Sequence, residues 1–182
     1  MKGVNCMNIW HDIDPLRITK DSFIAVIEIS KGSKNKYELD KETGLLRLDR
    51  ILYTSTHYPS NYGFIPRTLC GDNDPLDVLV LCNEEIIPMS ILECIPIGVL
   101  IMTDNNAEDE KIIAVCKNDP LMKNYKDIKD LPQHTFNEIM HFFTVYKDLE
   151  DSNVTVKQVL GSEDAKKIIE KSMENYKKEF EK

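Results

Sequence analysis

The sequence predicts an α+β fold in which a small antiparallel barrel or sandwich is followed by two amphipathic helices. Short segments with an apolar residue at every second position fill the first two-thirds of the chain, and turn residues separate them, as in small barrels and sandwiches. After residue 133 the apolar residues recur at helical spacing. Helices packed on one sheet system make an α+β fold. With 182 residues, 42% of them hydrophobic, we expect one domain spanning 1–182.

The alternation predicts strands at 22–30, 36–40, 45–53, 77–81, 97–103 and 111–116. Residues 41–44 predict a hairpin turn, because Gly44 can take a positive φ. The segment 58–64 is interpreted as an ordered turn, with the hydroxyl of Tyr62 near the acidic residues that follow it.

Two helices complete the predicted fold. The first has an apolar stripe that consists of Phe136, Ile139, Met140, Phe143 and Tyr146. The second has a stripe that consists of Ala165, Ile168, Ile169, Met173, Tyr176 and Phe180. Ser162 is expected to be the N-cap of this second helix. Tyr146 continues its stripe, so its hydroxyl is expected to point back to the body of the protein.

The most informative segment is Asp-Asn-Asp-Pro-Leu-Asp at 72–77, directly before an apolar strand. Three carboxylates within six residues, with a proline between the second and the third, must project from a tight loop rather than a helix. Such crowding is stabilised by a hard divalent cation, because Mg²⁺, Mn²⁺ and Ca²⁺ take oxygen ligands. The segment does not fit an EF-hand, since the fifth and sixth loop positions hold Leu76 and Asp77. The chain also has no glycine-rich phosphate loop, HExxH or GxSxG motif.

Several charged residues fall on strand faces that should be apolar. Alternation puts Glu28 on the face of Ile24 and Val26, and it puts Arg50 on the face of Leu48. Lys36 and Glu38 share a face of their own strand. Each of these charged residues, taken alone, is explained at least as well as a residue on a solvated strand edge that forms weak ion pairs. Together with the acidic loop, these charges indicate one pocket that presents both cations and carboxylates.

The net charge and the cysteine content restrict the possible functions further. The formal net charge of −8 argues against sequence-independent nucleic-acid binding, which depends on basic residues. The five cysteines have no CxxC or Cys/His ligand spacing, which predicts reduced, buried thiols. The sequence has neither a long apolar segment nor an apolar signal region, so we expect a cytoplasmic protein without membrane contact.

Taken together, these residues resemble the soluble inorganic pyrophosphatases, a family built on an OB-like barrel whose signature is Asp-x-Asp-Pro-x-Asp before an apolar strand. Further matching segments lie, in the family's order and approximate spacing, at 27–29, 36–38, 49–50, 58–63, 103–104, 109–111 and 146–149. The resemblance runs from residue 28 to residue 147. It implies a mainly antiparallel, OB-like five-stranded β-barrel with two principal flanking α-helices.

The resemblance implies hydrolysis of inorganic pyrophosphate to two orthophosphates by a metal-activated water. The cofactor would be several Mg²⁺ ions, with Mn²⁺ or Zn²⁺ as substitutes. Asp74 matches the general base. The matching metal ligands are Asp72, Asp77, Asp104 and Asp109. The matching substrate-binding residues are Lys36, Arg50, Tyr62, Lys111, Tyr146 and Lys147, and the residues matched around them are Glu28, Glu38 and Tyr58. By the same analogy the protein would be a homo-oligomer, with a hexamer as the family example.

Two positions depart from the family pattern. Asn105 stands where a second acid is common, which predicts altered affinity for the later metals rather than loss of activity. His57 stands where an apolar residue is expected, and packing explains it better than catalysis. Two other functions remain open from the sequence, a non-catalytic OB-type oligonucleotide-binding module and an inactive metal-binding relative. The charge disfavours the first, and the set of phosphate-binding cations disfavours the second.

Overall fold

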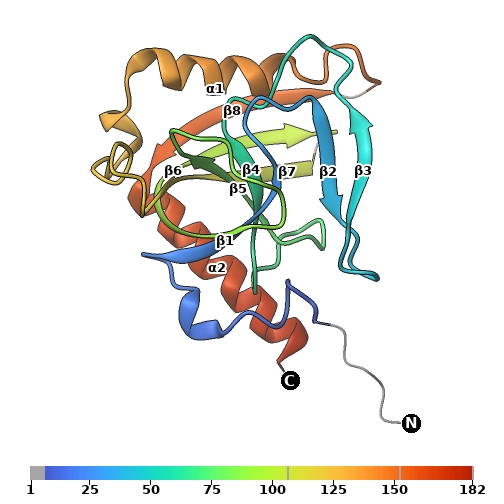
Figure 1. The fold of residues 1–182 in the computed structure, drawn as a ribbon, viewed down its shortest axis with the longest axis vertical. Helices are drawn as coiled ribbons and strands as arrows, with labels where there is room; N and C mark the ends of the chain where they lie inside the picture. Colours follow the sequence, from blue (N-terminus) through green and yellow to red (C-terminus); the bar gives the residue numbers. More distant parts are fainter. Residues whose placement is uncertain (1–6, 106, 152, 182) are drawn as a thin grey trace.

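The structure is a computed structural model that describes residues 7–105, 107–151 and 153–181 (Figure 1). Its strands are β1 (Phe23–Ile29), β2 (Asn35–Leu39), β3 (Leu46–Ile51), β4 (Asn61–Ile65), β5 (Leu76–Leu81), β6 (Ile91–Asp104), β7 (Ala107–Cys116) and β8 (Val154–Gly161). Its α-helices are α1 (Gln133–Val145) and α2 (Ser162–Phe180), and two short 3₁₀ turns lie at Pro15–Arg17 and Ile128–Asp130.

A closed ring of hydrogen-bonded strands forms the body of the protein. The strand order is β1-β4-β5-β7-β6, and β1 also pairs with the first residues of β6, which closes the ring. All of these pairs are antiparallel except β5 with β7. Strand β8 joins the outer edge of β6. The predicted α+β fold, with a five-stranded OB-like barrel and two helices, is therefore confirmed.

Strands β2 and β3 form a separate two-stranded sheet beside the barrel (Figure 1). The register shifts near Lys36, so that Arg50 pairs with Lys36 and Leu48 pairs with Tyr37. Asp49 is the extra residue, and a β-bulge of this kind changes which residues share a face. The expectation that Arg50 and Leu48 share a face is therefore wrong. Arg50 lies on the face of Lys36 instead.

Two strands were not expected from the sequence. Strand β4 is the segment interpreted as a turn, and all five of its residues are buried between β1 and β5. It lacks the alternation of a half-buried strand, because neither face meets water. Strand β8 alternates between half-buried and exposed residues over its first four positions, but no strand is predicted there, because the segment lies between the two helices in the sequence.

Helix α2 begins at Ser162, and its N-cap is Gly161, so the predicted Ser162 cap is wrong. The cap comes from another part of the chain. The carboxylate of Asp127 accepts hydrogen bonds from the backbone N–H of Ser162 at 2.9 Å and from its hydroxyl at 3.1 Å. This contact satisfies one of the free N–H groups that every helix start exposes.

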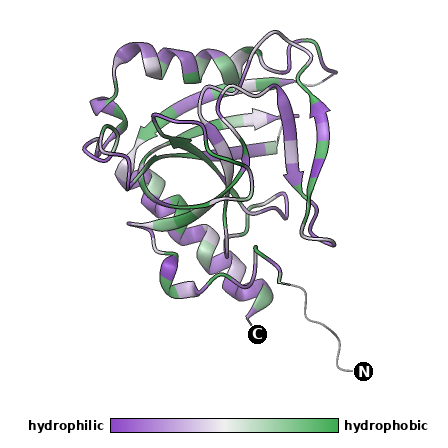
Figure 2. Cartoon of the chain, in the orientation of Figure 1, coloured by the Kyte–Doolittle hydropathy of each residue, from purple (hydrophilic) through white to green (hydrophobic). Residues whose placement is uncertain are grey.

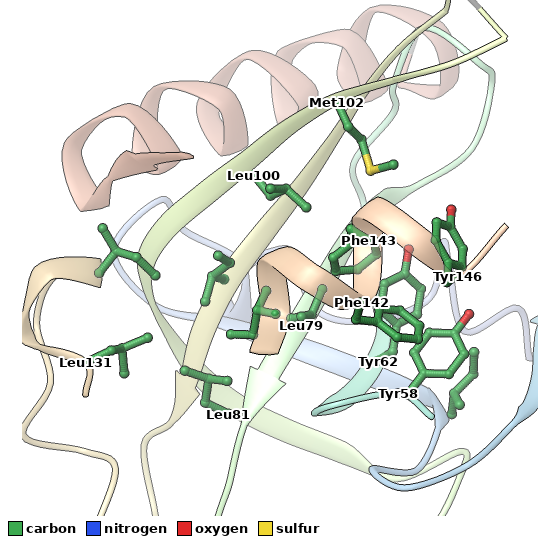
Figure 3. Close-up of a cluster of buried hydrophobic side chains, with 14 of the residues drawn as sticks. Tyr58, Tyr62, Leu79, Leu81, Leu100, Met102, Leu131, Phe142, Phe143 and Tyr146 are labelled. Atoms are coloured by element: carbon green, nitrogen blue, oxygen red, sulfur yellow. The ribbon is translucent and has the colours of Figure 1, made fainter. Parts of the chain in front are cut away.

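The helices cover the barrel with their apolar faces. Ala165 and Ile169 of α2 are buried in a cluster with residues of β1, β5, β6 and β7. Figure 2 shows apolar residues concentrated in the barrel strands and alternating with polar residues along α2. On the other side, Phe142 and Phe143 of α1 pack with Tyr58, Tyr62 and Tyr146 (Figure 3). The three tyrosines thus belong to the barrel core and to the rim of the cavity described below.

Four of the cysteines are described, and all are free thiols, with Cys94 and Cys116 buried and Cys70 and Cys82 half-buried. Cys6 lies outside the described residues. Among the described helices, none has the length and apolar character needed to cross a membrane.

Candidate active site

A cavity of about 550 Å³ lies where the barrel, the β2–β3 hairpin and the end of α1 meet. Every predicted site residue except Arg50 lines it. These residues are Glu28, Lys36, Glu38, Tyr58, Tyr62, Asp72, Asp74, Asp77, Asp104, Asp109, Lys111, Tyr146 and Lys147. The structure thus brings together side chains that are spread over more than a hundred positions of sequence.

Lys111 occupies the centre of this constellation. Its ammonium donates to Asp77 Oδ2 at 2.7 Å, to Asp109 at 2.9 Å and to the hydroxyl of Tyr62 at 3.0 Å. The Tyr62 hydroxyl in turn donates to Asp77 Oδ2 at 2.5 Å. The parallel register of β5 and β7 sets Asp77 beside Lys111, and Asp109 lies two residues earlier on the same face. Strand pairing therefore positions this polar cluster.

Lys111 is only 4% exposed. Burial alone would lower its pKa, but Asp77 and the other neighbouring acids outweigh burial and hold the pKa well above its ordinary value. Burial raises the pKa of Asp109, and Asp77 adds to that rise, although Lys111 opposes it. The cluster is thus a crowded set of carboxylates held by one cation.

Glu28 lies next to this cluster at a β-bulge of β1, between Ile27, which pairs with Gly63, and Ile29, which pairs with Tyr62. Its carboxylate accepts the backbone N–H of Leu39 at 2.6 Å. Burial raises the pKa of Glu28 to about 8, and the charge of Asp77 adds to the effect. The bulge explains how a charged residue is accommodated in an otherwise apolar strand.

The acidic loop forms one wall of the cavity. Asp72 Oδ1 accepts the backbone N–H of Asp74 at 3.0 Å, and Asn73 between them has a positive φ of 67°. The carboxylate of Asp74 forms an ion pair with Lys41, a residue that was not predicted. The proline and the left-handed Asn73 keep this loop out of helical structure, as expected from the sequence.

Lys147, which also lines the cavity, pairs with Asp104 Oδ2 at 2.5 Å. Asp104 Oδ1 is buried and has no hydrogen-bond partner within the described residues. Tyr146 is buried beside them, and burial raises its pKa above the ordinary value. A buried carboxylate oxygen without a partner is costly, which suits a position where a cation binds.

Arg50 lies outside the cavity lining. Its guanidinium donates to Asp49 at 2.5 Å and to Glu150 at 3.0 Å. Asp49 also accepts from Lys36 at 3.3 Å, so the two cations share one carboxylate. Arg50 Nη2 is buried and has no partner in the part of the chain that the structure describes. The N–H groups of Nη2 therefore have no acceptor among the described residues.

Asn105 is exposed and lies outside the cavity lining. It has a φ of 49°, and its side-chain oxygen accepts the backbone N–H of Asn153 at 3.1 Å. Asn is well suited to this left-handed position. His57 is exposed and lines a second cavity, of about 610 Å³, rather than the first.

The cavity also contains residues that sequence reasoning did not find. Trp10, Asp40, Lys41, Glu42 and Arg47 all line it. Trp10 comes from the segment before β1, and the others come from the β2–β3 hairpin. The charged residues among them match the pattern of ordinary solvent-facing residues, and Trp10 matches that of a core residue, so no local signal distinguishes them.

The donor set fits a hard divalent cation. A single cavity contains the carboxylate oxygens of Asp72, Asp77, Asp104 and Asp109. Asp104 Oδ1, which has no hydrogen-bond partner among the described residues, is a further oxygen that a cation could satisfy. Across the described residues, no three His, Cys, Asp or Glu side chains converge as a ready-made ligand group. Lys111 instead contacts both Asp77 and Asp109. Binding of a cation there would require the ammonium to move or to share these oxygens.

Comparison with known proteins agrees with this geometry. A family model described as inorganic pyrophosphatase matches residues 25–177. Soluble inorganic pyrophosphatase 1 of Arabidopsis thaliana is 52% identical over 167 residues, which cover 92% of this chain and 79% of the relative. The solved inorganic pyrophosphatase of Helicobacter pylori is 48% identical with a TM-score of 0.84, over 87% of this chain and 95% of that one.

The solved inorganic pyrophosphatase of Thermus thermophilus is 36% identical, with a TM-score of 0.87 over 94% of this chain and 99% of that one. The match to the family model covers most of the chain, and each of these relatives is covered over more than two-thirds of its own length. The chain belongs to the inorganic pyrophosphatase family.

Proposed function

We propose that this protein hydrolyses inorganic pyrophosphate to two orthophosphates. The observation that carries the proposal is that one cavity gathers the carboxylates around Lys111 together with further lysines. A polyanionic substrate needs cations to bind it, and a metal-activated water needs carboxylates. Family membership supports the same reaction.

We assign the metal sites to Asp72, Asp77, Asp104 and Asp109, and we propose Mg²⁺ as the ion they hold. Bound there, Mg²⁺ would screen the charge of pyrophosphate and lower the pKa of a water. In the same cavity, Lys111 already neutralises two of these carboxylates, Asp77 and Asp109. Oxygen ligands alone, without thiolate or imidazole, favour a hard cation over a soft one.

The cations and tyrosines grip the substrate. Lys36, Lys111 and Lys147 line the cavity as point charges for phosphoryl oxygens. The residues that donate hydroxyl or guanidinium groups are Tyr62, Tyr146 and Arg50. Because Arg50 lies outside the cavity lining, its assignment rests on the family pattern, and Nη2 is the donor that it would offer to a phosphoryl oxygen. Glu28, Glu38 and Tyr58 hold these groups in place.

Asp74 takes the proton of the attacking water. Its carboxylate lines the cavity beside Asp72 and Asp77 and is not buried, so it can exchange the proton with solvent. The protonated side chains of the cavity, chiefly Lys111 and Lys147, stabilise the negative charge that develops on the leaving orthophosphate.

The remaining expectations belong to the same proposal. We propose that residues 1–182 make one domain, that the protein is cytoplasmic and that it assembles as a homo-oligomer, with a hexamer by family analogy. An oligonucleotide-binding role is disfavoured by the formal net charge of −8 and by the acidic cavity.

Release of orthophosphate from pyrophosphate tests the proposal. With Mg²⁺, the wild type is expected to turn over pyrophosphate, and excess chelator is expected to abolish turnover. Asp74→Asn should lower kcat by about 100-fold or more, as loss of a general base does. Asp164→Asn, which removes an exposed carboxylate paired with Lys167, is the matched control and should leave kcat unchanged. A wild type without turnover would contradict the function, and a fully active Asp74→Asn would contradict only the role of Asp74.

A further inference from the structure

The tip of the acidic loop is held by a lysine outside the predicted site. Lys41 lies in the turn between β2 and β3, 33 residues away from Asp74 in sequence. Its ammonium pairs with Asp74 Oδ1 and donates to the backbone carbonyl of Asn73 at 3.3 Å. The hairpin that carries Lys36 and Glu38 is thereby joined to the loop that carries the proposed base.

Lys41 is in turn positioned by Trp10. Its ammonium lies 5.1 Å from the centroid of the indole ring, within the range of a cation–π contact. Trp10 is 5% exposed, and its Nε1 donates to the backbone carbonyl of Thr68 at 3.0 Å. The indole therefore provides a fixed platform for an otherwise flexible lysine side chain.

Thr68 anchors the base of the same loop. Its hydroxyl donates to the carbonyl of Ile65 at 2.5 Å and accepts the N–H of Leu76 at 2.8 Å, so it joins the end of β4 to the start of β5. Contacts thus run from the loop base at Thr68, through Trp10 and Lys41, to the loop tip at Asp74. We name the side chains of Trp10 and Lys41 the Trp10–Lys41 bracket.

The direction of the Asp74 carboxylate depends on this bracket. The side chain of Asp74 is 54% exposed, so packing does not fix its rotamer. Lys41 is its one side-chain hydrogen-bond partner among the described residues. An exposed ion pair contributes little to stability. The effect of Lys41 should therefore fall on the reaction rather than on the fold.

We propose that the Trp10–Lys41 bracket positions Asp74 for proton transfer, which makes Lys41 a positioning residue for the reaction given under Proposed function, on which this inference rests. Misplacing a reacting group by about 1 Å costs up to about 100-fold in rate. Lys41 holds one oxygen of Asp74 and leaves the other free to face the cavity.

The first test is steady-state hydrolysis of magnesium pyrophosphate by Lys41→Met, which keeps a long apolar side chain over Trp10 but removes the ammonium. We expect kcat to fall about 10-fold, as for other residues that orient a catalytic group. KM should change by less than about two-fold, because the proposed role involves no substrate contact. Lys41→Arg should restore most of the rate. A rise in KM with unchanged kcat would overturn the inference.

The matched control is Lys20→Met. Lys20 pairs with Glu170, and the two side chains are 45% and 51% exposed, against 44% and 54% for Lys41 and Asp74. Both substitutions remove one ion pair of similar exposure, and Lys41→Met also removes the exposed ammonium from the Trp10 ring; both should leave the melting temperature within about 2 °C of the wild type. Only Lys41→Met should lower kcat. Equal effects of the two substitutions would overturn the inference.

A double-mutant cycle then tests whether Lys41 acts through Asp74. In the Asp74→Asn background, Lys41→Met is expected to lower kcat by less than about two-fold, because the group that Lys41 positions is already gone. A further 10-fold loss there would mean that Lys41 acts independently, which would overturn the positioning role.

Fluorescence gives a readout that does not require turnover or metal. Trp10 is the single tryptophan of the chain, so its emission reports on the surroundings of the bracket, which also include His11 and Phe180. Asp74→Asn should shift this emission in the wild-type background and leave it unchanged in the Lys41→Met background. No shift in either background would overturn the bracket. If the emission behaves as expected but the wild type hydrolyses nothing, the proposed function and the catalytic role of the bracket fail while the bracket itself stands.

Discussion

At the residue scale, the chemistry of the cavity depends on Lys111. A single buried ammonium contacts Asp77, Asp109 and Tyr62, which come from three different strands. In its absence two carboxylates would face each other in a poorly solvated site. A buried charge that loses its partner is expensive, so both stability and function should respond to this position.

Lys111→Met is therefore expected to lower kcat by about 100-fold or more, as for loss of a charge-stabilising donor. The free energy of unfolding should fall by about 1–3 kcal/mol, less than for a fully buried pair because Asp77 is partly solvated. Steady-state kinetics and urea unfolding measure the two effects. Lys117→Met, which removes an exposed pair with Glu93, serves as the control and should change neither.

Glu28 predicts a dependence of stability on pH. Burial raises its pKa from 4.5 to about 8, so between these values the folded state binds one more proton than the unfolded chain. Stability should therefore fall as the pH rises through this window, by at most about 1.4 kcal/mol per unit. Glu28→Gln removes the titration and keeps an oxygen for the N–H of Leu39.

Urea unfolding in metal-free buffer at pH 5 and pH 8 measures this effect. From pH 5 to pH 8, the free energy of unfolding of the wild type should fall by about 2–4 kcal/mol relative to that of Glu28→Gln. If the difference between the two proteins is the same at both pH values, Glu28 is ionised in the folded state and this interpretation is wrong.

At the scale of elements, the start of α2 is fixed by a residue more than thirty positions earlier. Asp127 accepts the N–H and hydroxyl of Ser162, and it also accepts the N–H of Lys129 in its own 3₁₀ turn at 3.2 Å. These hydrogen bonds lower the pKa of Asp127, and the bond from the backbone of Ser162 has the largest effect. One carboxylate thus joins the helix to the turn that precedes α1.

Asp127→Ala should lower the free energy of unfolding by about 1–2 kcal/mol, the usual cost of losing a helix cap. Asp127→Asn keeps an acceptor oxygen and should lose less. Thermal or urea unfolding gives both values, and kcat should stay within about two-fold of the wild type because Asp127 lies outside the cavity lining. Equal stability of Asp127→Ala and the wild type would contradict the capping role.

Strand β4 offers a second test at this scale. A Cβ on Gly63 would lie 1.8 Å from the backbone carbonyl oxygen of Val26 in the neighbouring strand β1, and backbone cannot move aside. Gly63→Ala should cost on the order of 3 kcal/mol or more. Gly71→Ala, where a Cβ meets nothing within 4 Å, is the matched control and should stay within about 0.5 kcal/mol of the wild type in urea unfolding.

At the scale of the whole molecule, the sequence could predict what depends on local pattern. Alternation predicted most strands, and the spacing of carboxylates in 72–77 predicted a polar loop, which lines the cavity. Strand β4 could not be recognised, because it is buried on both sides and contains Gly63. The bulge at Asp49, which sets the face of Arg50, depends on strand pairing and leaves no trace in the spacing.

The site residues also divide into those that the sequence could predict and those that depend on the tertiary fold. The resemblance assigned residues whose types carry the chemistry, and the cavity gathers nearly all of them. Lys41 and Trp10 could not be assigned, because each contacts the loop only through the tertiary fold. Nor could the sequence predict that Lys111 would contact two proposed metal ligands at once, since that contact depends on the parallel register of β5 and β7.

We propose that the carboxylates around Lys111 are metal ligands as well as ion-pair partners. Equilibrium dialysis of Mg²⁺ against the substrate-free wild type and Asp77→Asn tests it most directly. We expect the wild type to bind Mg²⁺ in the millimolar range or tighter and Asp77→Asn to bind it about 10-fold more weakly or worse. Equal Mg²⁺ binding by the two proteins would contradict it.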